Sequence, residues 1–325
     1  MRNHPIGIAM LLGAALIWGT ALVAQSLGMN YTGPFAFNAA RFFIGGVSVW
    51  LVSMLSGAVI SYRHKHSLLH SPTHSSGQDQ TPGRAETGTA PDGAEKQNKS
   101  PLLKGGLICG VVLFVTVSFQ QIGISMTSVG KAGFITTLYI VMVPVLSLFL
   151  GKRVPGRVWL CIALATAGLY LLCINESLSV NMGDVYIFLC ALLTAVHLLL
   201  IDRYARLVDC LKLTYLQIFI CSALSAASAL LFEETSPAAL LAGWGPLLYT
   251  GFLSCAVAYM FQTLGQKYVN PVGASLLLSL ESVFAVCAGW LFLHEALSGK
   301  ELLGCVLIFT ATLTAQLPGR RRSAV

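Results

Sequence analysis

The stretch from 131 to 150 reads KAGFITTLYIVMVPVLSLFL and contains one charged residue, Lys131. A helix needs about 20 mostly apolar residues to cross the hydrocarbon core of a bilayer. The stretch therefore predicts a membrane-spanning helix. Pro144 lies inside it and frees a backbone carbonyl, so we expect a kink there that could act as a gating point.

The rest of the chain is built in the same way. Hydrophobic residues make up 55% of the 325 residues and charged residues 10%, with a mean hydropathy of +0.74, whereas soluble proteins carry about 25% charged residues. The strand-like alternation of a membrane barrel is absent from the sequence. We predict an all-α membrane protein with ten transmembrane helices, at residues 6–25, 34–56, 102–124, 131–150, 157–174, 183–201, 213–232, 245–265, 271–293 and 300–317.

The net charge of +7 could indicate a nucleic-acid partner. The basic residues, however, lie between the apolar segments rather than in one patch, so membrane orientation explains them better and we expect no nucleic acid. Cytoplasmic connections are enriched in Lys and Arg. With a cytoplasmic N-terminus, 17 of the 20 Lys and Arg residues fall inside, Lys131 and Lys300 fall outside, and Arg41 lies within a helix. We predict a multi-pass protein of the cell (inner) membrane with both termini cytoplasmic.

One connection, 61–100, is long and rich in Ser, Thr, Gly and Pro, which predicts a flexible cytoplasmic loop. Four histidines in it could gather a metal ion on one helical turn, but Pro72 and its Ser and Gly neighbours disfavour a helix there. These histidines are His64, His66, His70 and His74. The nine cysteines show no metal-ligand spacing and are expected to act as small apolar residues. We therefore expect no metal site and no cofactor.

The two halves of the chain resemble each other at a shift of 143 positions. Val129-Gly130, Leu148-Phe149-Leu150 and Gly156-Arg157 correspond to Val272-Gly273, Leu291-Phe292-Leu293 and Gly299-Lys300. Matching leucines in apolar helices is weak support for a repeat, whereas Gly-Arg against Gly-Lys at the same place, without a gap, is stronger.

Each half, 1–174 and 175–325, contains five predicted helices. Because five is an odd number, the second half must cross the membrane inverted relative to the first. Inverted repeats rock about a substrate site near the midplane. The halves therefore predict two inverted five-helix repeats and an alternating-access carrier.

Several motifs resemble those of the drug/metabolite transporter superfamily, and most closely its EamA-type permeases. They are Leu16-Ile17-Trp18-Gly19-Thr20, Asn38-Ala-Ala-Arg41-Phe42, Thr127-Ser-Val-Gly130-Lys131-Ala132, Glu281-Ser-Val-Phe-Ala and Trp290-Leu-Phe-Leu-His-Glu295. The resemblance covers nearly the whole chain apart from 61–100, and it rests on the order and spacing of these motifs. It implies a ten-helix carrier that exports amino acids or related metabolites. One departure is that Lys152 follows Gly151, where the family often has Gly-Glu, and we expect a structural role for that loop.

Three ionisable residues lie deep in predicted helices, where such groups are costly and indicate function. Glu281 lies near the middle of the ninth segment and could bind a proton; a structural hydrogen bond to a neighbouring helix is the alternative. Arg41 could bind a substrate carboxylate through two hydrogen bonds, or else pair with a protein carboxylate or reach toward the surface. His197 could relay protons or could be a hydrogen-bonded packing residue.

Polar and aromatic residues in other helices could line a wet cavity, with the aromatic rings giving apolar or cation–π contacts. The alternative is hydrogen bonding between helices, with the aromatic rings at the lipid interface. The residues are Trp18, Gln25, Gln120, Gln121, Thr136, Thr137, Tyr139, Tyr259 and Gln262.

Other functions find less support. A membrane-embedded enzyme acting on lipid-like substrates would need paired carboxylates, a Ser/His arrangement or a HExxH motif, yet Glu233-Glu234 falls in a loop and His294-Glu295 lacks the second histidine. A channel does not need an inverted repeat, and carriers of drugs or sugars from the same superfamily stay open. We expect no enzyme activity, no catalytic residues, a lipid bilayer and a small-molecule substrate as partners, and a monomer or homodimer.

Overall fold

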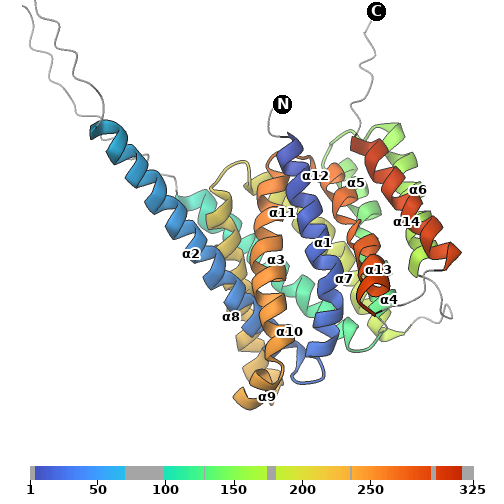
Figure 1. Ribbon diagram of the computed structural model, residues 1–325, viewed down its shortest axis with the longest axis horizontal. Helices are drawn as coiled ribbons and strands as arrows, with labels where there is room; N and C mark the ends of the chain where they lie inside the picture. The colour runs from blue at the N-terminus through green and yellow to red at the C-terminus, as the bar shows by residue number, and fades with distance from the viewer. Residues whose placement is uncertain are drawn as a thin grey trace, which may run out of the picture.

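The computed structural model describes residues 4–69, 99–127, 129–173, 181–234, 236–293 and 298–316. All regular secondary structure in these ranges is helical, which confirms the predicted all-α class for them (Figure 1). The elements are α1 (His4–Gly28), α2 (Pro34–Leu69), α3 (Lys99–Ile124), α4 (Val129–Thr137), α5 (Tyr139–Phe149), α6 (Gly156–Cys173), α7 (Met182–Tyr204), α8 (Cys210–Phe232), α9 (Pro237–Ala242), α10 (Trp244–Leu248), the π-helix η1 (Tyr249–Ala258), α11 (Tyr259–Gln266), α12 (Pro271–Leu278), α13 (Glu281–Leu293) and α14 (Gly299–Gln316).

Each of the ten predicted segments falls on one helix or on consecutive helices. Seven helical stretches in the described ranges are long and apolar enough to cross a membrane, and two shorter apolar stretches, Gly156–Leu171 and Pro271–Cys287, accompany them. The seven are His4–Gly28, Pro34–Gly57, Ser100–Ile124, Ala132–Phe149, Met182–Tyr204, Cys210–Phe232 and Trp244–Gln266. The chain is therefore a multi-pass membrane protein.

The predicted loop at 61–100 begins too early. Helix α2 continues to Leu69 and thus includes His64 and His66, because neither Gly nor Pro interrupts the chain between Gly57 and Pro72. His70, His74 and the rest of the predicted loop up to 98 lie outside the described residues.

Two membrane segments are each interrupted near the middle. The first is split at Leu138, between α4 and α5, and the second at Ser279 and Leu280, between α12 and α13. Leu138 (φ −58°, ψ −11°) and Ser279 (φ −62°, ψ −15°) have nearly the same backbone angles. These angles resemble those of the tighter 3₁₀ turn found at hinges inside helices. The interruption in the first segment precedes Pro144, and α5 runs on through that proline.

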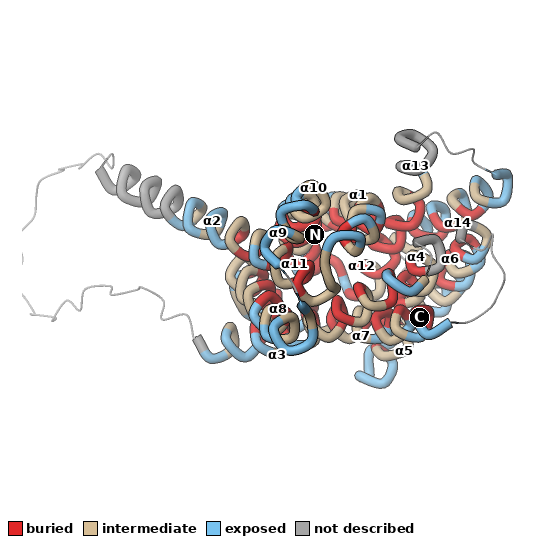
Figure 2. Tube along the Cα trace, turned by 90° about the horizontal axis from the view of Figure 1, so that it is seen from below, coloured by how far each residue is buried: buried red, intermediate tan, exposed pale blue. Residues whose placement is uncertain are grey.

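The helices pack as a flat bundle with α2 and α8 at one end and α6 and α14 at the other (Figure 1). Helices α1, α7, α11 and α12 meet in the middle, where Figure 2 shows the buried residues concentrated. The large outward-facing side chains are mostly apolar, as in Leu16, Phe43, Leu160 and Leu230. Such a surface is suited to lipid, so the polar groups of the bundle are left to face its interior.

Candidate functional site

A cavity of about 80 Å³ lies at the centre of the bundle, between the two interrupted segments. All eight residues predicted as substrate or proton sites line it, although they come from seven different elements: Trp18, Arg41, Gln120, Tyr139, His197, Tyr259, Gln262 and Glu281. A cavity needs about 10–15 Å³ of such volume to hold one water molecule, so this cavity has room for several waters.

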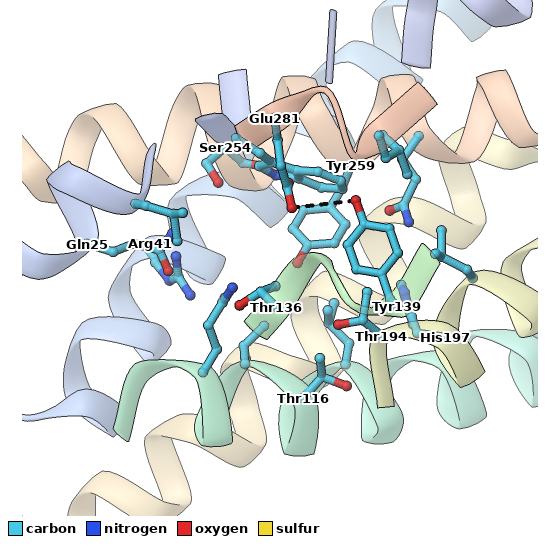
Figure 3. Close-up of a pocket in the computed structure, with 18 residues that line it drawn as sticks. Gln25, Arg41, Thr116, Thr136, Tyr139, Thr194, His197, Ser254, Tyr259 and Glu281 are labelled. Carbon is cyan, nitrogen blue, oxygen red and sulfur yellow. Dashed lines mark hydrogen bonds between the residues drawn. The ribbon is translucent and has the colours of Figure 1, made fainter. Parts of the chain in front are cut away.

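Glu281 is the first residue of α13 and is buried, because the interruption at Ser279 and Leu280 places it against α4 and α5. Its Oε1 accepts a long hydrogen bond from the hydroxyl of Thr137 at 3.3 Å. It accepts another from the hydroxyl of Tyr139 at 3.5 Å, which Figure 3 shows as a dashed line. Thr137 has one proton to donate and lies closer to the carbonyl of Gly133, at 2.8 Å. In the described ranges Glu281 forms no ion pair, so the protein leaves this carboxyl weakly satisfied.

A close approach of α1 supports this arrangement. A Cβ atom on Gly19 would lie 2.4 Å from the carbonyl oxygen of Glu281 and 3.0 Å from the nitrogen of Ala285. Only glycine permits the two backbones to come this near, and α1 carries Trp18 into the cavity beside it. The glycine of the Trp18-Gly19 motif thus holds the interrupted helix at the cavity.

Arg41 lies across the cavity from Glu281, next to Gln25 (Figure 3). Its Nε donates to Oδ1 of Asn38 at 2.9 Å, and its guanidinium lies 5.0 Å from the centroid of the Phe42 ring and 5.6 Å from that of Phe37. The side chain is buried, and within the described part of the chain no carboxylate pairs with it. A buried charge is normally paired, so this guanidinium is available to an anion that enters the cavity.

His197 and the aromatic residues form the remaining wall. Nε2 of His197 lies 3.0 Å from Oε1 of Gln217. The His197 ring packs edge-on against the ring of Tyr259, with 6.5 Å between the two ring centroids. Tyr259 also packs edge-on against Trp18 at 5.1 Å. The indole of Trp18 donates to the carbonyl of Ser254 at 3.3 Å, within the π-helix η1. This histidine is thus hydrogen-bonded and packed, while one edge still faces the cavity.

Buried polar atoms without a protein partner are also found at the cavity. Among the residues that the structure describes, Oε1 of Gln25, Oγ1 of Thr136 and Oε1 of Gln262 find no partner, and all three residues line the cavity. A buried polar atom left unpaired costs about 1–3 kcal/mol. These atoms give the cavity unused hydrogen-bonding capacity that water or a polar substrate would satisfy.

The sequence interpretation also named residues that lie elsewhere, and it missed some that do not. Gln121 is buried but donates to the carbonyl of Gln25 instead of facing the cavity, and Thr137 lies behind Glu281. Thr116, Thr194 and Ser254 line the cavity and were not predicted. Thr116 precedes Gln120 by one helical turn and Thr194 precedes His197 by three residues, so helical spacing from the predicted residues would have found both.

Comparison with known proteins shows the family of the chain and agrees with its fold. The model of the EamA-like transporter family matches residues 5–70, 90–174 and 181–315. The chain belongs to the EamA-like transporter family. It is similar to an uncharacterized transporter of Archaeoglobus fulgidus, with 28% identity over 317 residues that cover 96% of this chain and 85% of that one.

Two further likenesses extend over most of the chain. The uncharacterized transporter YoaV of Bacillus subtilis is 23% identical over 306 residues, which cover 92% of each chain. A protein of known crystal structure shares the fold, with a TM-score of 0.72 and 20% identity, and the match covers 98% of this chain and 99% of that one. The protein is therefore a membrane transporter of the drug/metabolite superfamily, as its sequence motifs predicted.

Proposed function

We propose that this EamA-like transporter is a secondary carrier that exports amino acids or related small metabolites by alternating access, with its substrate held in the central cavity. The observation that carries the proposal is the placement of Arg41 and Glu281 on opposite sides of one cavity (Figure 3). They are buried charges of opposite sign without a partner of opposite charge in the described ranges. Such a pair suits a zwitterion, whose carboxylate would lie at Arg41 and whose ammonium would lie at Glu281.

Glu281 also offers a route for coupling to a proton gradient. A carboxyl that is weakly hydrogen-bonded in a low-dielectric cavity exchanges a proton or a cation more readily than one held in a salt bridge. When substrate or proton occupies Glu281, the buried charge is neutralised, and the closed form of the cavity becomes less costly. This provides a physical link between binding and the change of conformation.

The proposed mechanism uses two inverted five-helix repeats, 1–174 and 175–325, and the pattern of helix contacts supports them. Under the repeat, α1, α2 and α3 of the first half correspond to α7, α8 and the pair η1 and α11 of the second half. The contacts of α3 with α7 and α8 therefore correspond to the contacts of η1 with α1 and α2, and α11 also packs on α1. The contacts of α4 and α5 with α7 likewise correspond to those of α12 and α13 with α1. The remaining large contacts, α2 with α8 and α6 with α14, join each helix to its own counterpart.

Helix direction supports the inversion. Near the start of α1, Gly7 lies against Tyr268 and Val269, which follow α11, while Gln266 at the end of α11 donates to the carbonyl of Leu198 near the end of α7. The start of α1 and the end of α7 therefore lie on the same side of the bundle. The two interruptions also correspond, since a shift of 143 residues places Leu138 on Glu281.

A metabolite-resistance and efflux screen tests the function. Cells overproducing the chain should tolerate a toxic analogue of the exported amino acid and release the parent compound faster than cells overproducing Arg41→Gln at equal abundance. If only uncharged drugs or sugars are exported, and if Arg41→Gln exports them equally well, the zwitterion assignment fails.

A topology measurement tests the arrangement in the membrane. The basic residues predict that Gly77 and Val325 are both cytoplasmic. A reporter that is active only outside the membrane should therefore be silent at both positions. Activity at either one would reject the orientation, and activity at only one would reject an even number of crossings between them.

A further inference from the structure

A second cavity, of about 390 Å³, lies away from the central one, at the end of the bundle where α5 leads into α6. Its walls come from the loop after α5, the start of α6, the start of α12 and the end of α14. In Figure 1 these ends lie on the same side of the bundle as the start of α1. The cavity thus joins elements from both halves of the chain at one membrane face.

The charge in this cavity is all of one sign. Lys152, Arg153 and Arg157 line one wall, Asn270 and Gln316 line the other, and no acidic side chain is among the lining residues that the structure describes. The polar groups of the second wall are engaged with the backbone, since Asn270 accepts from the nitrogen of Gly273 at 2.8 Å and Gln316 donates to its carbonyl at 3.1 Å. The wall is therefore held in place opposite the cations.

The basic side chains of this cavity differ in their ion pairs. Lys152 lies 3.0 Å from Oδ2 of Asp202 and is about half exposed, at 48%. Arg153 is exposed, and in the described ranges no carboxylate pairs with it. Lys152 is thus balanced by Asp202, whereas Arg153 brings to the cavity a positive charge that no carboxylate of the described ranges balances, and such a charge attracts an anion.

The surroundings of the cavity are those of a lipid site. Val158, Val272 and Leu276 supply apolar walls. Next to the basic loop, at the end of α5, Phe149 is 84% exposed and Leu150 is 63% exposed, facing outward. A phosphate at the basic wall with acyl chains along the exposed apolar residues would satisfy both features, and basic pockets at helix ends bind anionic headgroups in this way.

We propose that this cavity binds the phosphate headgroup of an anionic phospholipid, with Arg153 and Arg157 contacting the phosphate. The occupant would connect the loop between α5 and α6, in the first half, with α12 and α14, in the second. The site would therefore respond to the lipid composition of the membrane independently of the substrate in the central cavity.

The test is a binding measurement on the purified full-length protein, made by native mass spectrometry with phosphatidylglycerol and phosphatidylcholine as the probes. The parental protein should retain phosphatidylglycerol in preference to phosphatidylcholine. Because each basic residue near an anionic lipid contributes a similar attraction, Arg153→Gln should bind it about fivefold more weakly and the double variant with Arg157→Gln about thirtyfold more weakly.

Lys104→Gln is the matched control, because Lys104 is an exposed lysine of α3 that does not line the cavity. It should bind phosphatidylglycerol like the parental protein, and all variants should show parental melting temperatures in detergent. If Arg153→Gln and the double variant also bind like the parental protein, the proposal is overturned.

A parallel titration with inorganic phosphate separates the two sources of a phosphate group. If phosphate alone raises the melting temperature of the parental protein but not of Arg153→Gln, the occupant is a soluble phosphate compound, and the lipid assignment is overturned. If phosphate has no effect while phosphatidylglycerol binding depends on Arg153, the lipid headgroup is the occupant.

Discussion

Two of the buried carboxylates, in different regions of the bundle, have opposite surroundings. Near the end of α7, Asp202 lies within 3.0 Å of Lys152 and 2.8 Å of Arg206, and its side chain is 8% exposed. At the centre, Glu281 is equally buried and accepts from two hydroxyls, at 3.3 and 3.5 Å. Within the part of the chain that the structure describes, the first carboxylate has cationic partners and the second has none.

The difference supports the proposal that the charge of Asp202 is structural and that Glu281 has a role in transport. Asp202 connects α7 to the loop after α5, so its charge is used to hold two elements together. Glu281 and Arg41 are each buried without an opposite charge from the described protein, a costly arrangement that selection would remove unless the groups served another purpose. Binding a charged substrate or a proton is the simplest such purpose at the centre of a transporter.

The largest expected effect is on the cationic side of the central cavity. Replacing Arg41 with Gln removes charged hydrogen bonds that contribute about 1.5–3 kcal/mol, so apparent substrate affinity should fall about 10- to 100-fold. Arg41→Lys keeps the charge but not the planar two-point contact, and it should recover only part of the affinity. Transport by purified protein in vesicles measures both variants. Parental affinity in Arg41→Gln would show that this buried cation is structural after all.

The paired carboxylate should behave differently. Asp202→Asn removes the charge that Lys152 and Arg206 share, but both cations are about half exposed and can return to water. The free energy of unfolding should therefore fall by only about 1–2 kcal/mol. The melting temperature in detergent should drop by a few degrees, while transport per folded molecule stays at the parental level. A loss of transport in a fully folded Asp202→Asn protein would give this pair a role in the transport cycle.

The smallest effect is expected from shortening the predicted polar loop. Residues 71–95 belong to this loop and lie outside the described structure. Shortening them should leave transport nearly intact, because a polar flexible connection contributes little packing. Transport by cells that produce the shortened chain at parental abundance is the measurement. A correctly inserted but inactive protein would reveal a role for this segment.

Much of the central cavity could be predicted from sequence, because polar side chains in membrane segments avoid the lipid. Arg41, His197 and Glu281 lie within the predicted apolar segments, and such groups must face the bundle interior. The same reasoning placed Gln120 and Gln262 correctly. It could not choose between neighbouring residues on one helix, and so it included Gln121, which faces another backbone.

Other features required the tertiary structure. Ser254 lies in a π-helix, whose wider turn changes which residues share a face. No residue type in the sequence indicates that change. The interruption at Leu138 was not predicted, since the visible signal was Pro144, which α5 accommodates. The pairing of Lys152 with Asp202 joins residues 50 positions apart, and only the packing of α5 on α7 brings them together.

We infer that the carboxyl of Glu281, which forms no ion pair in the described ranges, takes part in transport, and Glu281→Gln in vesicles tests this inference most directly. Glutamine preserves the shape of the side chain and its hydrogen-bonding capacity but does not titrate. The variant should insert and fold like the parental protein, and across pH 5 to 8 it should lose most transport or lose its dependence on pH. Transport at the parental rate over that whole range would show that the carboxyl is structural and would contradict the account.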